Sequence, residues 1–217
     1  MFDKKTNRVR DLLGLLVFPI LGLIYGWLNN SHQDAVTLST SFDNSIPFLP
    51  VFIIPYISWY GYIVFYLLYF WQKSTALYWK TISLITVGEV LCFCIYYFFQ
   101  TTVPRPELSG DGLLIQLVYF IYTNDQPFNC FPSIHVLTTS AIMLSILNLE
   151  NTSVRQQFIC YFIGALIILS TLFVKQHIIY DVVASIIVSI SLNSFLPSLK
   201  KPMLRVERKT QKEYQTF

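Results

Sequence analysis

Residues 156–174, QQFICYFIGALIILSTLFV, form an uninterrupted uncharged stretch between Arg155 and Lys175. About 20 apolar residues are enough for an α-helix to cross the hydrocarbon core of a bilayer. The whole 217-residue chain has the same character, because 54% of its residues are hydrophobic and only 12% are charged. Soluble domains carry about 25% charged residues. We therefore predict an all-α integral membrane protein and not a water-soluble domain.

Charged residues divide the remaining sequence into apolar blocks of similar length. We predict a single membrane domain over residues 1–217, built as a bundle of six transmembrane helices. The first block follows a basic start but no small-residue cleavage site follows it, so we interpret it as a span and not as a signal peptide. The predicted spans are residues 12–28, 51–71, 81–99, 133–149, 156–174 and 178–199, and a basic tail follows at 200–217.

Basic residues are distributed unevenly between the two sides of this predicted bundle. If the six spans alternate, all but two of the 15 lysines and arginines fall on the side of the two termini. Basic loops stay in the cytoplasm, so we predict that both termini are cytoplasmic, with the plasma membrane as the location. The two exceptions are Arg105 and Lys175, whose place on the extracytoplasmic side needs another reason.

The outer loop between the third and fourth predicted spans contains an apolar stretch at residues 112–123. This stretch is too short to span a bilayer, so we expect a surface or re-entrant helix that lies over the bundle. The four cysteines show neither metal-ligand spacing nor a disulfide framework, and we expect them to be packing residues. We predict no metal and no other cofactor.

The segment that opens the sixth predicted span contains an ionisable pair, His177 and Asp181. Residues four apart share a face of a helix. A carboxylate that accepts a hydrogen bond from one imidazole nitrogen leaves the other nitrogen able to attack an electrophile. The pair therefore predicts a catalytic site, although a structural ion pair that ties the helix to a neighbour explains it equally well when it is taken alone.

Four further residues on the outer side carry polar groups. Ser133 and His135 open the fourth predicted span, where a helix N-terminus offers amides to an anion and a histidine can protonate a leaving group. Taken alone, a capping serine with a buried histidine is the commoner explanation. A guanidinium such as that of Arg105 binds phosphate with two donors, and Lys175 offers a second cation, but both can also contact lipid headgroups. Their convergence on one face predicts a phosphate-binding site.

At these residues the sequence resembles the type 2 phosphatidic acid phosphatase superfamily. Arg105-Pro106 matches the end of its first motif, Pro132-Ser133-Ile134-His135 matches its second motif with isoleucine for glycine, and Ser170, His177 and Asp181 match its third motif. The resemblance implies that His177 is the nucleophile, that Asp181 orients it, and that His135 is the acid for the leaving group. It also implies that Arg105 holds phosphate oxygens and that no metal is needed.

The sequence departs from the family pattern at two cation positions. Phe98 stands where a lysine is expected, and Thr171 stands where an arginine is expected. The segment Lys175-Gln176-His177 looks more like the branch related to inositol phosphorylceramide synthase, and sphingomyelin synthases are a more distant comparison. A phosphodiester with one negative charge needs fewer cations than a monoester dianion or a diphosphate. The departures are therefore compatible with a headgroup transferase.

Three functions are compatible with these residues. We prefer a membrane-bound phosphatase that hydrolyses a lipid-linked phosphate monoester or diphosphate, such as a lipid phosphate or a polyprenyl phosphate, through a phosphohistidine at the extracytoplasmic face. The first alternative is a phosphodiester headgroup transferase. The second is a non-enzymatic transporter or packing subunit, for which the buried carboxyl of Glu89 is the main argument. We expect contacts with membrane lipids and none with nucleic acid.

Overall fold

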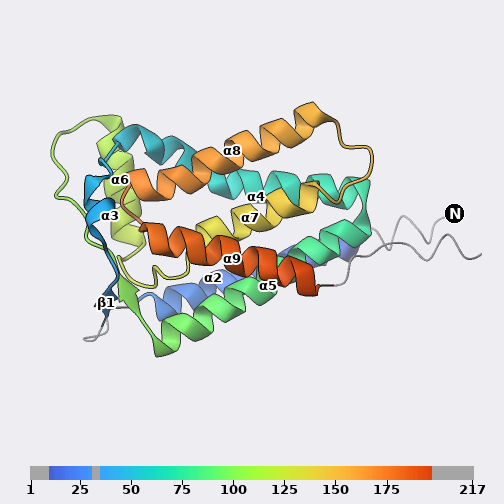
Figure 1. The fold of residues 1–217 in the computed structure, drawn as a ribbon, viewed down its shortest axis with the longest axis horizontal. Coiled ribbons are helices and arrows are strands. Elements are labelled where there is room, and N and C mark those ends of the chain that lie inside the picture. The colour runs from blue at the N-terminus through green and yellow to red at the C-terminus, as the bar shows by residue number, and fades with distance from the viewer. Residues whose placement is uncertain (1–9, 31–34, 197–217) are drawn as a thin grey trace, which may run out of the picture.

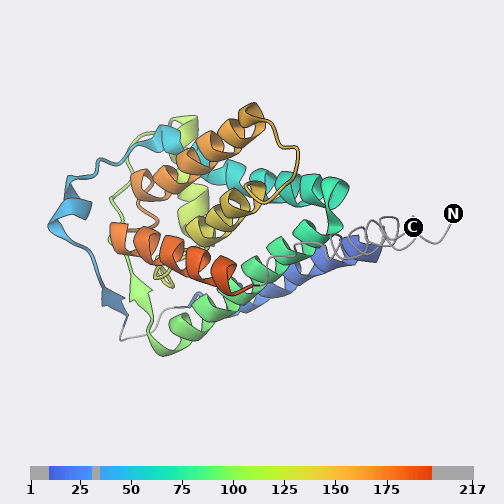
Figure 2. The same cartoon turned by 45° about the vertical axis from the view of Figure 1, so that its right-hand side comes forward.

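Helices account for most of the residues that the computed structural model describes, which are residues 10–30 and 35–196. Figures 1 and 2 show the longer helices side by side along the long axis of the molecule. They are α2 (Val17–Leu28, preceded by a 3-10 turn at Leu12–Leu16), α4 (Ile53–Lys73), α5 (Thr75–Phe98), α7 (Ile134–Ile146), α8 (Val154–Phe173) and α9 (Ile179–Phe195).

The predicted helical class is confirmed, and a short two-stranded sheet accompanies the helices. Helix length does not settle the predicted number of spans. Among the described residues, three helices are long and apolar enough to cross a membrane, namely Pro50–Lys73, Thr75–Phe98 and Val154–Phe173. The stretches Leu12–Leu28, Ile134–Ile146 and Ile179–Phe195 are apolar but shorter. Residues 197–199 of the sixth predicted span, and the predicted tail at 200–217, lie outside the described residues. The six-span count and the side of the termini therefore stay predictions.

Serine side chains mark the starts of three of these helices. Ser74 separates α4 from α5 and accepts a hydrogen bond from the backbone N–H of Leu77. Ser153 begins α8 with a capping box, in which Oε1 of Gln156 accepts a hydrogen bond from the backbone N–H of Ser153. Such caps satisfy backbone donors that a helix leaves unpaired at its first turn, and they allow the tight connections between successive helices.

Helix α7 lies at the centre of the bundle and packs against α4, α5, α8 and α9. Close approach to α5 is possible because α5 has Gly88 at the contact, where an added Cβ would lie 2.7 Å from the Leu137 side chain. The outward faces of the bundle carry exposed apolar side chains, including Leu23 and Trp27 on α2. Such a surface suits lipid as the surrounding solvent better than it suits water.

Short elements cover one end of the bundle (Figure 1). Helix α6 (Leu113–Asn124) lies across this end, as expected for the apolar stretch at 112–123, and α3 (Ser41–Ser45) lies nearby. Strands β1 (Val36–Thr37) and β2 (Thr101–Thr102) pair in parallel and join the two outer loops. Figure 1 also shows that the described chain begins at the opposite end, where α9 finishes. The covered end is where α7 and α9 begin and where α8 finishes.

Candidate active site

The turn between α8 and α9 positions His177. Lys175 has a φ of 54°, a left-handed conformation that is uncommon for residues other than glycine. The backbone N–H groups of Gln176 and His177 then both donate to the carbonyl of Thr171, at 3.0 and 3.1 Å. His177 therefore lies just outside α9, in a turn that the end of α8 holds.

Two acceptors hold the same ring nitrogen of His177. Its Nδ1 lies 3.2 Å from Oδ2 of Asp181 and 3.0 Å from the backbone carbonyl oxygen of Cys130. A carbonyl can only accept, so Nδ1 carries the proton and donates it, and Nε2 keeps its lone pair. Oδ2 of Asp181 also accepts from the backbone N–H of Ile178 at 3.0 Å, which fixes the carboxylate. The result is an imidazole with one held nitrogen and one nitrogen ready to attack.

His135 is the second imidazole, in the first turn of α7, and its ring lies 6.0 Å from that of His177. Ring contacts hold it, because the ring of Tyr56 stacks on it at 4.6 Å and that of Trp59 lies at 4.3 Å. Its Nε2 is buried and has no hydrogen-bond partner among the residues that the structure describes. The two histidines predicted from separate segments thus come together and line the same cavity.

Ser133 is fully buried and serves as the N-cap of α7. Its hydroxyl accepts a hydrogen bond from the backbone N–H of Val136 at 3.3 Å. Its backbone carbonyl accepts from the Ser185 hydroxyl of α9 at 2.9 Å. Ser133 therefore has the capping role that the sequence analysis gave as the alternative to phosphate binding. Its backbone carbonyl also links α7 to α9.

Arg105 links the outer loop to the turn before His177. Its Nη2 donates to the backbone carbonyl of Asp125 at 2.7 Å and to Oε1 of Gln176 at 2.6 Å, and its Nη1 donates to the carbonyl of Tyr122 at 3.1 Å. Its Nε is buried and unpartnered within residues 10–30 and 35–196. A guanidinium has five N–H donors, so protein carbonyls use part of its capacity and leave part for a ligand.

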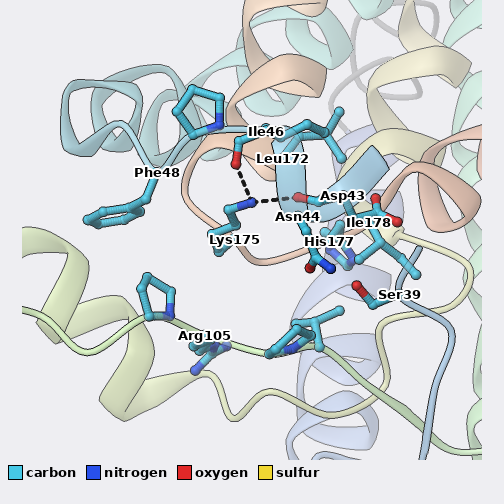
Figure 3. A pocket seen from close by; sticks show the side chains of 14 residues that line it. Ser39, Asp43, Asn44, Ile46, Phe48, Arg105, Leu172, Lys175, His177 and Ile178 are labelled. Carbon is cyan, nitrogen blue, oxygen red and sulfur yellow. Dashed lines mark hydrogen bonds between the residues drawn. The ribbon is translucent and has the colours of Figure 1, made fainter. Parts of the chain in front are cut away.

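Lys175 contacts the other outer loop. Its Nζ donates to the backbone carbonyls of Asp43 and Ile46, at 2.9 and 2.6 Å (Figure 3). Burial lowers the pKa of the Lys175 ammonium, and the neighbouring Asp43 carboxylate opposes that shift. The sequence predicted Lys175 as a phosphate ligand, and the structure shows it first as a brace between α3 and the turn that carries His177.

Asp43 is a residue of this site that the sequence analysis missed. Its Oδ1 accepts from the backbone N–H of Ile179 at 2.8 Å, in the first turn of α9, and its Oδ2 accepts from Thr40 in a capping box. Burial favours the neutral acid, but the hydrogen bonds from Thr40 and Ile179 outweigh it and hold the pKa of Asp43 below its usual range. The pattern threonine-x-x-aspartate is a capping signal in the sequence, but it does not show the contact with α9.

Two cavities meet at His177. The smaller, of about 440 Å³, has Arg105 and Lys175 on facing walls (Figure 3). The larger, of about 950 Å³, lies between α2, α4, α5, α6 and α7, has mostly apolar walls, and also contains His135. Glu89 lines this larger cavity from α5. His177 therefore borders two spaces: a smaller cavity lined by Arg105, Lys175 and Asp43, and a larger, mostly apolar cavity.

A family model of the PAP2 superfamily matches residues 76–201, which is more than half of the chain. The chain belongs to the PAP2 superfamily. Membership indicates a membrane phosphatase or phosphotransferase in general terms. The matched segment contains both histidines, Asp181 and Arg105. No curated protein and no solved structure matches the chain.

The two departures from the PAP2 pattern add no cation to this site. The side chain of Phe98 is 83% exposed at the end of α5 and faces outward. Thr171 is buried, its hydroxyl donates to the carbonyl of Ile168, and its own carbonyl holds the His177 turn. Within the described part of the chain, no group of three or more His, Cys, Asp or Glu residues is arranged to hold a metal ion.

Asp125 is a second residue that the sequence analysis missed. Its Oδ1 accepts from the Tyr25 hydroxyl at 2.7 Å and from Nδ2 of Asn29 at 2.8 Å. Burial raises the pKa of the Asp125 carboxyl, and the hydrogen bond from Tyr25 and the charge of Arg105 offset part of the rise. Asp125 belongs to no motif, and its partners Tyr25 in α2 and Asn29 at the C-cap of α2 lie about 100 residues away, so no local pattern signals it.

Proposed function

We propose that this PAP2 protein is a membrane phosphatase that removes phosphate from a lipid-linked monoester or diphosphate through a phosphohistidine on His177. One observation carries the proposal: Nδ1 of His177 is held by Asp181 and the Cys130 carbonyl, while the ring of His135 lies 6.0 Å away. A fixed tautomer directs Nε2 at the phosphorus, and a second imidazole at this distance has room to serve the oxygen on the other side of it.

The reaction follows in two steps. In the first, Nε2 of His177 forms a bond to phosphorus, the bond from phosphorus to the leaving oxygen breaks, and that oxygen takes a proton from His135. Asp181 stabilises the positive charge on the His177 ring. In the second, His135 takes a proton from water, the water oxygen bonds to phosphorus, and the nitrogen–phosphorus bond breaks. Both histidines then regain their starting protonation states.

The cationic cavity supports a place for the phosphate oxygens. Arg105 keeps a buried Nε without a partner among the described residues, and Lys175 lies on the facing wall of the same cavity. Charged donors stabilise the charge that develops in phosphoryl transfer. We therefore assign phosphate binding to Arg105 and Lys175, in addition to the bracing contacts that both already make.

Six spans fit the path of the chain. The helices α2, α4, α5, α7, α8 and α9 follow the long axis one after another (Figure 1). Each of the helices α2, α4, α5, α8 and α9 carries exposed apolar side chains. The described chain begins and ends opposite the site. With cytoplasmic termini, the site opens on the extracytoplasmic side of the plasma membrane, where the lipid phosphate substrate enters from the bilayer.

A transferase of the inositol phosphorylceramide synthase or sphingomyelin synthase kind is the second candidate, and the larger cavity favours it. This cavity gives His177 and His135 a common apolar space of about 950 Å³. The positions of Phe98 and Thr171 supply no cations, which suits a phosphate group with a single negative charge. In this case an alcohol replaces water in the second step.

Turnover of lipids by the purified protein tests the proposed function. Wild type in lipid nanodiscs is given phosphatidic acid or a polyprenyl diphosphate, and released phosphate is measured beside an acid-labile phosphoenzyme. We expect both from the wild type and neither from His177→Ala. Turnover that survives in His177→Ala would place the nucleophile on another residue, and a folded wild type that shows no turnover would favour the transporter or packing subunit. Retained activity in a metal chelator is expected, together with inhibition by vanadate.

A further inference from the structure

One end of the larger cavity is polar, although most of its wall is apolar. Three residues that line this cavity each have a buried side-chain atom without a hydrogen-bond partner in the described part of the chain, namely Nε2 of His135, Oδ1 of Asn29 and Nδ2 of Asn129. Buried polar atoms in proteins nearly always have a hydrogen-bond partner. Three exceptions around one cavity point to a ligand that supplies the missing partners.

The two asparagines are held in defined orientations. Nδ2 of Asn29 donates to Asp125 at 2.8 Å, which leaves its oxygen as the unused atom. Oδ1 of Asn129 accepts from Nε2 of Gln100 at 2.9 Å, which leaves its nitrogen unused. Asn29 and Asn129 are only 8% and 2% exposed, so their side chains lie away from bulk solvent. The cavity therefore offers one fixed acceptor and one fixed donor.

A hydroxyl group matches this pair, because it donates one hydrogen bond and accepts others. A phosphate oxygen matches it poorly, since an anion cannot donate to Asn29. Among the described residues, no lysine or arginine lines the larger cavity, whereas Arg105 and Lys175 line the smaller one. We therefore expect the phosphate in the smaller cavity beside Arg105 and Lys175. We expect a neutral hydroxyl in the larger cavity beside the two asparagines.

We propose that Asn29 and Asn129 form a subsite for the hydroxyl of a lipid alcohol, which replaces water in the second step. The proposal rests on the proposed phosphohistidine at His177. The alcohol oxygen bonds to phosphorus and the nitrogen–phosphorus bond breaks. The alcohol proton, which points to Oδ1 of Asn29 in the bound state, turns to Nε2 of His135 and is transferred there as the oxygen attacks. The rest of the alcohol lies against the apolar wall, where Phe18, Ile63 and Leu67 are among the lining residues. The product is a phosphorylated lipid alcohol beside the phosphate that water releases.

Partition of the phosphoenzyme between alcohol and water tests this subsite. The full chain in nanodiscs receives a lipid phosphate labelled at phosphorus, together with increasing amounts of a monoacylglycerol that carries a fluorescent acyl chain. The labelled alcohol product and released phosphate are measured in the same reaction. We expect the ratio of transfer product to phosphate to rise with the alcohol and to level off, as binding at a subsite requires.

Substitutions at Asn129 are chosen to suit its backbone. Its φ of 59° is left-handed, a conformation that aspartate and glycine tolerate. Asn129→Asp keeps an acceptor for Gln100 but has no donor for the alcohol, and Asn129→Gly removes the side chain. Loss of one hydrogen bond predicts that the ratio falls by about tenfold in both variants. Asn29→Ala, which removes the acceptor, should lower the same ratio if the Asn129 variants fold poorly.

A matched control is Asn148→Ala, which changes an exposed asparagine at the opposite end of the bundle whose Nδ2 donates to the Leu144 carbonyl. It should keep the wild-type ratio. A ratio that is unchanged in the folded variants overturns the subsite, as does a wild type that forms phosphoenzyme and yields no alcohol product. A wild type that forms no phosphoenzyme rejects the proposed function itself, and these two failures are distinguishable in one experiment.

Discussion

The turn that carries His177 and the first turn of α7, which carries His135, face the same space but are built in opposite ways. Hydrogen bonds hold His177, through Asp181 and the Cys130 carbonyl at Nδ1. Ring contacts with Tyr56 and Trp59 hold His135, and its Nε2 has no partner within the described residues. The proton of His177 is fixed at Nδ1. The ring plane of His135 is fixed by its aromatic neighbours, and its Nε2 forms no hydrogen bond with the described residues.

This difference matches two chemical tasks. A nucleophile needs a single tautomer throughout the reaction, so a permanent acceptor at the opposite nitrogen helps it. A general acid and base must lose and regain a proton, so a permanent partner at its working nitrogen would compete with the substrate. The two regions therefore predict different responses to substitution.

The largest effect is expected from His177→Asn, which removes the nucleophile but keeps a side chain that can contact Asp181. Phosphate release should fall by at least about 10,000-fold, because no other group replaces a covalent nucleophile. No acid-labile phosphoenzyme should appear on rapid acid quench. A phosphoenzyme that survives in this variant would show that another residue is the nucleophile, and His177 and His135 would then not have the two roles proposed here.

A smaller loss, of about 100-fold to 1,000-fold, is expected from His135→Phe with a lipid phosphate substrate. Phenylalanine keeps an aromatic ring against Tyr56 and Trp59 but has no nitrogen to carry a proton. An aryl phosphate with a weakly basic leaving group should restore much of the first-step rate, measured as the burst of released phenol, because that leaving group needs no proton.

His177→Asn is the control for this rescue, since a better leaving group cannot replace a nucleophile. Equal losses with both substrates in His135→Phe would show that His135 does not protonate the leaving oxygen. The contrast between the two histidines would then be one of packing alone.

Asp181→Asn should cost less than loss of the nucleophile, about 100-fold in kcat/KM. Loss of the aspartate charge lowers the rate strongly in related triads, partly because the histidine adopts the wrong tautomer. Here the Cys130 carbonyl still accepts from Nδ1 at 3.0 Å, so the correct tautomer persists. Glu107→Gln, at an exposed position in the outer loop, is the control. A loss as large as that of His177→Asn would mean that the carbonyl alone does not hold the ring.

The same comparison separates what the sequence could predict from what it could not. Apolar blocks predicted the helices, and the stretch at 112–123 predicted α6 over the end of the bundle, because these follow from local composition. His177 and Asp181 were expected to pair across one helical face. They pair instead from a turn into the first turn of α9, which the spacing alone does not distinguish.

The sequence did not predict the contacts between segments that lie far apart along the chain. The Cys130 carbonyl is 47 residues from His177, and Asp43 is 136 residues from its partner in α9. No periodicity encodes a backbone carbonyl as a partner. For the same reason Arg105 and Lys175 were predicted as phosphate ligands or lipid-headgroup contacts, while the structure shows both donating to protein carbonyls.

The smallest effect is expected at Asp43. Its carboxylate accepts a hydrogen bond from Ile179 in the first turn of α9 and so supports the hydrogen-bonded region, which is the turn that carries His177. Because the hydrogen bonds from Thr40 and Ile179 lower its pKa in the folded protein, its charged form stabilises the fold. This stabilisation is present above the pKa of an unfolded aspartate, about 3.9, and is lost as the pH falls through the lower folded value. Asp43→Asn should therefore lower the free energy of unfolding at pH 7 by about 1 kcal/mol, as for loss of a helix cap.

Thermal unfolding in detergent micelles measures this difference between wild type and Asp43→Asn. At pH 7 a shift in Tm of about 2–4 °C is expected for a chain of this size, and it should shrink as the pH is lowered below about 3.9. The exposed Asp111→Asn is the control and should leave Tm unchanged at both pH values. A shift that stays constant down to acid pH would show that the amide, and not the lost charge, destabilises α9. The hydrogen-bonded region would then owe its rigidity to the Lys175 brace and the Thr171 carbonyl rather than to Asp43.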